Sequence, residues 1–396
     1  MFQKFVLLMS AASFFTMMNN RLLDSLALRM LIYVFMVFYV IWVVRFTYNK
    51  APHLYRNRKV VLLVILLSIN MIVSPYDPMY PRLIKYLGYI GSFAFGYVLC
   101  ENNISMKCNK MIMGSLVMLP LIFVGFFDHT AHKELFFPLS NTYSYLGLCC
   151  SIFIFTVYNE HKVIFLWSIG LIIAYIISAS SLGIVTAVAL SVIIINRKNV
   201  KLVVPLCFMA ILCVVAIMTI DIPVFLRIRD VVNIATSLSL NDWTHLKDMN
   251  FYEASLQVDM QSDRVDNTSF LWRFAHWQYI LEGFLENWWY AIPFGLGDCY
   301  ANKVCGNYCH NEYVKFLAEN GVIVFSILFT WILVVIKKLK GTKANYFILS
   351  AFCYHLTENL IDTFVACVLL YFCIGYWIKR VELERNIRNK KQLLYD

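Results

Sequence analysis

Residues 309–336 read CHNEYVKFLAENGVIVFSILFTWILVVI, and this stretch decides the fold class. From Gly321 onward it contains no charged side chain, and Lys337 and Lys338 follow directly after it. An uncharged apolar run that approaches about 20 residues and ends at lysines is typical of a membrane-spanning helix. The polar half before Gly321 belongs to a segment outside the membrane. A hydrophilic insertion therefore meets a membrane span at this glycine.

Membrane character extends over most of the chain. Hydrophobic residues make up 60% of the sequence and charged residues 15%, and the mean hydropathy is +0.66. In a typical soluble domain about 25% of the residues are charged. We therefore predict an all-α, polytopic integral membrane protein with about twelve transmembrane helices. The predicted spans are residues 2–18, 27–46, 59–74, 83–100, 111–127, 144–158, 162–178, 180–196, 202–220, 321–336, 345–361 and 363–378.

The distribution of charge argues against a nucleic-acid partner, although the net charge is +10. The basic residues gather in short segments between predicted spans, and with twelve spans every such segment falls on the same side of the membrane. The positive-inside rule makes that side cytoplasmic and places both termini there. The basic segments are residues 45–59, 107–110, 197–201, 337–340 and 379–391.

A long hydrophilic insertion separates the ninth and tenth predicted spans, and it carries more acidic than basic residues. We divide the chain into transmembrane helices 1–9 at residues 1–220, a large external loop at 221–320, and C-terminal transmembrane helices with a basic cytoplasmic tail at 321–396. Because the spans are mostly apolar, the loop holds most of the groups that could do chemistry.

Within the loop, apolar side chains recur every three or four residues and predict an amphipathic helix. They are Phe270, Phe274, Trp277, Leu281, Phe284 and Trp288. We expect this helix to lie along the outer membrane face or against the helix bundle, with its tryptophans at the interface. The cluster at residues 292–297, with one proline and two glycines, then predicts a turn, and a second helix is expected over residues 311–319.

Three arginines of the loop are candidates for binding an anion. Arg273 lies on the flank of the amphipathic stripe, where its planar guanidinium suits a phosphate or diphosphate. An arginine that snorkels from an interfacial helix fits the same position. Arg227 and Arg229 follow the ninth span directly. They can form a second clamp on the anion, or they can pair with the neighbouring Asp221 and Asp230.

His310 is the candidate general base, because a neutral imidazole can accept a proton from a sugar hydroxyl near pH 7. Asn311 or Glu312 can orient it. The alternative is a histidine that caps the start of the second helix. Glu358 and Asp362 occupy otherwise apolar surroundings near the outer ends of the last two spans. Ionisable groups are energetically costly in apolar surroundings. The two carboxylates can therefore have a functional role, or they can lie at a helix end that water reaches.

Cys299, Cys305 and Cys309 lie in the external loop, where an oxidising space would permit a disulfide between Cys305 and either neighbour. A zinc site built from these cysteines and His310 is the alternative. The CxxC spacing of zinc knuckles is absent, and we predict no metal site. The sequence also has no phosphate-binding glycine loop, HExxH motif or nucleophile elbow. No nucleotide site is visible, and no cofactor is expected.

The motifs of the loop, in their order, resemble the O-antigen polymerase and O-antigen ligase superfamily of bacterial envelope glycosyltransferases. The shared pattern is an arginine with an aromatic residue four positions later, a Pro/Gly turn, a His-Asn pair, and a helix that ends in acid-x-Gly. Here these are Arg273 and Trp277, residues 293–297, His310-Asn311, and Glu319-Asn320-Gly321. Arg227, four residues after Pro223, is similar to the arginine at the start of the family's loop.

This resemblance implies a metal-independent glycosyltransferase of the bacterial inner membrane that acts at the periplasmic face. Its donor would be a glycan on undecaprenyl diphosphate. Arg273 and Arg227 would hold the diphosphate, and His310 would deprotonate the attacking hydroxyl. Membrane lipids are expected partners, and a chain-length regulator protein is an open candidate. Substrate contacts are assigned to Asn311, Glu312, Trp277, Arg229, Arg264 and Glu358.

Among the activities that this resemblance allows, we favour the O-antigen polymerase, which joins lipid-linked repeat units. The alternative is the O-antigen ligase, which transfers the finished glycan to the lipid A core. A polysaccharide transporter or flippase would also suit twelve spans. The large external loop and the scarcity of charged residues inside the spans disfavour that third function.

Overall fold

The computed structural model describes a helical protein. In the described part of the chain every secondary-structure element is a helix, in agreement with the all-α prediction. The described residues are 1–18, 26–74, 81–118, 139–159, 161, 163–179, 182–196, 219, 233, 236, 238–244, 246, 269–305, 309–357, 360–361 and 363–392.

The chain divides into two compact units. Unit 1 comprises Met1–Ile72, Met79–Ser191 and Ser326–Asp396, and unit 2 comprises Val73–Pro78 and Val192–Phe325. Unit 1 contains all or most of α1 (Phe2–Met18), α2 (Leu26–Lys50), α3 (Pro52–Tyr55), α4 (Arg58–Val73), α5 (Pro81–Glu101), α7 (Leu139–Val157), α8 (Ile164–Ala179), α9 (Leu182–Asn196), α18 (Ala344–Tyr354) and α19 (Phe364–Gln392). Unit 2 contains α12 (Leu240–Thr244), α14 (Ser269–Glu286), α15 (Trp288–Phe294), α16 (Tyr300–Cys305) and the beginning of α17 (Glu312–Leu339).

Most predicted spans coincide with a helix, because long apolar runs set the helix limits. The helices α1, α2, α4, α5, α8 and α9 begin and end within a few residues of the predicted spans. Within the described residues, four helices are long and apolar enough to cross a membrane: Leu26–Lys50, Arg82–Glu101, Glu312–Leu339 and Phe364–Lys390. The predicted spans 111–127 and 202–220 extend outside the described residues. The count of twelve spans therefore stays a prediction.

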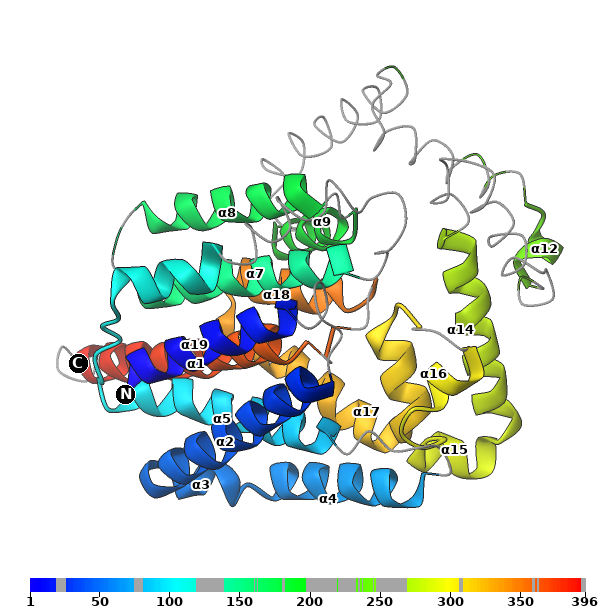
Figure 1. The fold of residues 1–396 in the computed structure, drawn as a ribbon, viewed down its shortest axis with the longest axis horizontal. Coiled ribbons are helices and arrows are strands. Elements are labelled where there is room, and N and C mark those ends of the chain that lie inside the picture. Colours follow the sequence, from blue (N-terminus) through cyan, green and yellow to red (C-terminus); the bar gives the residue numbers. More distant parts are fainter. Residues whose placement is uncertain are drawn as a thin grey trace. The chain divides into compact units, whose positions relative to one another are not determined.

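Two glycines bring α5 and α19 into backbone contact in unit 1, where these helices run side by side (Figure 1). A methyl group added at Gly96 would lie 2.0 Å from the carbonyl oxygen of Phe372. One added at Gly375 would lie 2.0 Å from the carbonyl oxygen of Phe93. Small residues allow membrane helices to approach this closely.

Ion pairs join the helix ends that the sequence predicts to be cytoplasmic. Lys379 Nζ lies 2.8 Å from Glu101 Oε1, and Lys338 Nζ lies 2.7 Å from Glu382 Oε1. These pairs connect α5, α17 and α19, and α1 begins and α19 ends at the same end of unit 1 (Figure 1). The basic segments at these helix ends thus share one side of the unit. That this side is cytoplasmic stays a prediction.

Candidate functional site

Unit 2 has a small hydrophobic core of its own. Side chains from α14, α15, α16 and α17, and from the segments that connect them, pack together and are almost fully buried. They are Ile280, Phe284, Ala291, Leu296, Tyr300, Ala301, Cys309 and Ala318. An insertion that buries its own apolar residues can hold polar side chains in fixed positions around them.

The helix α14 is the amphipathic helix that the sequence predicts, and part of its apolar stripe faces this core. Trp277 packs against the core, and Phe284 belongs to it. The rings of Phe274 and Trp277 lie 4.7 Å apart, and Trp243 of α12 packs edge-on against Phe274. We expected the outer membrane face or the helix bundle to cover this stripe. The core of unit 2 supplies an apolar partner for Trp277 and Phe284, and the position of the helix at the outer membrane face or the helix bundle stays a prediction.

A hydrogen bond connects α14 with the segment that leads into α17. The indole Nε1 of Trp277 donates to the backbone oxygen of Cys309 at 2.8 Å. Arg273 is partly buried one turn before Trp277 on α14, and His310 directly follows Cys309. Two residues predicted to act together therefore lie on segments that are hydrogen-bonded to each other.

His310 has an unusual backbone conformation directly before α17. Its φ is +52°, a left-handed value that is uncommon outside glycine and is found at turns and functional sites. The next residue, Asn311, caps the helix, because its Oδ1 accepts the N–H groups of Tyr313 at 3.0 Å and Val314 at 3.1 Å. Asparagine is a preferred N-cap residue. The helix therefore begins at Glu312, and the partly exposed His310 lies just outside it.

Three charged side chains of α17 are buried on one helical face. Glu312, Lys315 and Glu319 are 4%, 1% and 2% exposed, and their spacing of three and four residues places them above one another. Lys315 Nζ lies 4.0 Å from Glu312 Oε1. Because an isolated buried charge is strongly disfavoured, an opposite charge nearby is required. Lys315 is not among the predicted site residues, because its spacing of three residues from Glu312 also fits an exposed ion pair.

Glycine turns lock the end of α15 against α17. Gly295 has φ +84° and Gly321 has φ +72°, values that a residue with a side chain rarely adopts. A methyl group at Gly321 would lie 2.5 Å from the backbone nitrogen of Gly295. Leu296 N–H donates to the oxygen of Ala318 at 2.8 Å. The turn predicted at residues 292–297 begins only at Gly295, because residues 292–294 form the end of α15. It contacts α17 where Gly321 kinks that helix.

Several predicted site residues lie outside the described residues. They are Arg227, Arg229, Arg264 and Glu358. Asp362 also lies outside the described part of the chain. Their roles stay predictions. His355, which is close to Glu358 and Asp362 in the sequence, is buried in unit 1. Its Nε2 lies 3.0 Å from the hydroxyl of Tyr145.

Both alternatives predicted for the cysteines of the loop include Cys305, whose side chain lies outside the described residues, so both stay predictions. Cys299 and Cys309 are buried. Among the side chains that the structure describes, no three His, Cys, Asp or Glu residues are arranged to hold a metal ion.

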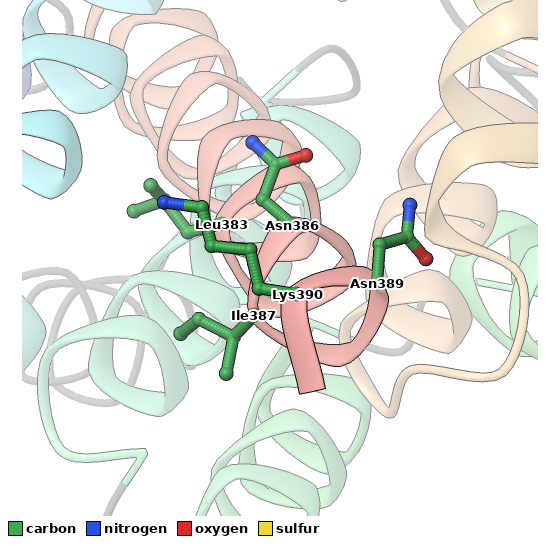
Figure 2. A pocket seen from close by; sticks show the side chains of 5 residues that line it. All are labelled: Leu383, Asn386, Ile387, Asn389 and Lys390. Atoms are coloured by element: carbon green, nitrogen blue, oxygen red, sulfur yellow. The ribbon is translucent and has the colours of Figure 1, made fainter. Parts of the chain in front are cut away.

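The last turns of α19 line an open hollow (Figure 2). Its residues are Leu383, Asn386, Ile387, Asn389 and Lys390. All five come from one helix, and their side chains point in different directions around it (Figure 2). They do not bring an acid and a base together, so we place the candidate site in unit 2.

Residues 163–329 match the O-antigen ligase family. The match begins just before α8 and ends within α17, so it includes Arg273, Trp277 and the His310-Asn311 pair. No curated protein matches the chain. The resemblance to the O-antigen polymerase and ligase superfamily is confirmed by this match, which covers less than half of the chain.

Proposed function

We propose that the chain is an O-antigen polymerase, a glycosyltransferase that joins repeat units carried on undecaprenyl diphosphate. The family match supports an enzyme of the polymerase and ligase superfamily, and the long apolar helices support a membrane location. We place the reaction at the periplasmic face of the inner membrane, with both termini in the cytoplasm, because the basic segments mark the cytoplasmic side.

The hydrogen bond between Trp277 and the Cys309 carbonyl is the observation that best supports this proposal. It fixes the helix of Arg273 to the residue that precedes His310. An anion-binding guanidinium and a proton acceptor are the two groups that a sugar transfer from a lipid diphosphate needs.

In the proposed reaction, a hydroxyl oxygen of the acceptor sugar bonds to the anomeric carbon of the donor. The bond between that carbon and the diphosphate oxygen breaks, and undecaprenyl diphosphate leaves. His310 takes the hydroxyl proton. Arg273, with Arg227 as a second clamp, stabilises the negative charge on the leaving diphosphate. We propose a metal-independent reaction, since the guanidinium groups supply the positive charge.

The O-antigen ligase is the second candidate, because the matching family covers both activities. Both activities use the same donor and the same proposed residues, but they differ in the acceptor. A polymerase uses a repeat unit on another lipid carrier, and a ligase uses the lipid A core. A polymerase would also have a chain-length regulator as a candidate partner.

A lipopolysaccharide gel from a strain that lacks this gene separates the two activities. A core that carries one repeat unit, without the longer ladder, is the expected result for the polymerase. Bare core with long glycan left on the lipid carrier would identify the ligase. An unchanged ladder would refute both.

Complementation of this strain tests the catalytic assignment. His310→Ala should fail to restore the ladder at normal membrane abundance, because the proton acceptor is lost. The matched control is His161→Ala, the same change at an exposed residue of unit 1, and it should restore the ladder. A normal ladder with His310→Ala would remove the catalytic role of His310 and favour a transporter.

A further inference from the structure

The short helix α15 is apolar on both faces. Its inner face includes Ala291, which is fully buried in the core of unit 2. Its outer face exposes Trp288 and Trp289 by 63% and 71%, together with the smaller Ile292, and Phe294 at the end of the helix is 60% exposed. The helix contains no charged residue. A helix with apolar side chains all round needs an apolar partner on each face, and a cluster of exposed aromatic residues marks an interaction surface.

The end of α15 contacts the start of the apolar run in a candidate membrane-spanning helix. Gly321 contacts the end of α15, because an added methyl group there would lie 2.6 Å from the backbone nitrogen of Phe294. Val322 and Ile323 follow Gly321 directly and are 40% and 43% exposed. They are the first side chains of the uncharged run in the candidate span Glu312–Leu339. Exposed apolar side chains therefore occur both on α15 and at the start of the candidate span that its end contacts.

We propose that the outer face of α15 rests in the interfacial layer of the lipid bilayer and anchors unit 2 there. Tryptophan is enriched in this layer, where its ring is apolar and its N–H reaches water or headgroups. An amphipathic element that lies in the interface buries its apolar residues at the boundary between headgroups and acyl chains. The bilayer is favoured over a protein partner because it must already surround the span that begins at Gly321.

This anchor sets the height of the candidate site above the hydrocarbon. His310 lies eleven residues before Gly321. At about 1.5 Å per residue, the helical part between them, residues 312–320, is roughly 14 Å long, and His310 lies just before it. The headgroup layer on each side of a bilayer is about 5–8 Å thick. A sugar on a membrane-bound diphosphate projects just beyond that layer, within the range open to His310. This last step rests on the proposed function.

Fluorescence quenching in vesicles tests the anchor. The full-length protein is reconstituted into phosphatidylcholine and phosphatidylglycerol vesicles that contain lipids with a spin label at a shallow or a deep acyl position. The chain has nine tryptophans, so the signal of α15 is the difference between the unmodified protein and the Trp288→Phe/Trp289→Phe variant. The matched control is Trp243→Phe, which removes a partly buried tryptophan of unit 2 that packs against Phe274.

The difference signal of α15 should be quenched by the shallow label more strongly than by the deep label, and more strongly than the Trp243 signal. Equal quenching of both signals, or stronger quenching by the deep label, would overturn the proposal. The measurement does not depend on glycan transfer. A quenched α15 in a protein without transferase activity would refute only the proposed function, and an active enzyme with unquenched α15 would refute only the anchor.

Discussion

Replacement of Trp277 by phenylalanine should lower the rate of glycan transfer more than it weakens donor binding. The indole Nε1 donates to the Cys309 oxygen at 2.8 Å, and Cys309 is fully buried. Phenylalanine keeps an aromatic ring against the core but has no N–H group. The Cys309 carbonyl therefore loses this hydrogen bond at a buried position. An unsatisfied buried acceptor costs about 1–3 kcal/mol.

That free energy limits the size of the effect. If all of this free energy goes into displacing the segment that carries His310, the fraction of molecules with His310 in its reactive position falls by about 5- to 150-fold. The value of kcat should fall within this range. The KM for the lipid-linked donor should change less, because Arg273 remains on α14 one turn away.

The assay is transfer of a lipid-diphosphate-linked glycan by the purified full-length protein, with kcat and KM measured separately. Trp167→Phe is the matched control, since it makes the same change at a residue of α8 that is 72% exposed, and it should behave as the unmodified protein does. A Trp277→Phe variant as active as this control would refute the positioning role. A raised KM at unchanged kcat would assign Trp277 to substrate binding, as the sequence first indicated.

Substitutions at three further positions are tested by the glycan ladder and by the abundance of the protein in membranes. Arg273→Lys keeps the charge but loses the forked guanidinium, so transfer should fall severely; near-normal transfer would favour a snorkelling arginine. Gly321→Ala should reduce abundance or activity, because its φ is +72° and its new methyl group would lie 2.5 Å from Gly295 N. Gly341→Ala is the control for backbone strain alone, since its φ is +87° but no atom lies within 4 Å of the added group. Asn311→Asp keeps the N-cap and should retain more activity than Asn311→Ala, which costs about 0.5–2 kcal/mol of helix stability; the reverse order would point to substrate binding.

The limits of many helices could be predicted from the sequence because two strong local signals determine them, but α18 ends seven residues before its predicted span does, and α19 continues through the basic segment to Gln392. Apolar runs without charge set the spans, and basic segments mark where they end. The start of the span at Gly321 could also be predicted, because an apolar run begins there. The structure places a helix on both sides of this glycine, with a kink between them. The polar segment before it forms a helix because Asn311 caps its start.

The residues that pack against a predicted helix could not be predicted from such local signals. The apolar stripe of α14 shows which of its residues need an apolar partner, but many surfaces can supply one. The core of unit 2 does so through residues far along the chain, such as Tyr300 and Ala318. Lys315 was missed for the same reason. Its spacing from Glu312 fits an exposed pair as well as a buried one, and only the fold decides between them.

The conformation of His310 gives a physical reason for a histidine and an asparagine to stand side by side at this site. Asn311 uses its side chain to begin α17, so the backbone must leave the helical direction one residue earlier. That residue is His310, whose left-handed φ of +52° turns the chain. Histidine tolerates this region better than most residues do, although it is still strained. The hydrogen bond from Trp277 to Cys309 holds the chain on the other side of the turn. The backbone of the proposed base is therefore held on both sides, by the N-cap of Asn311 and by the hydrogen bond to Cys309.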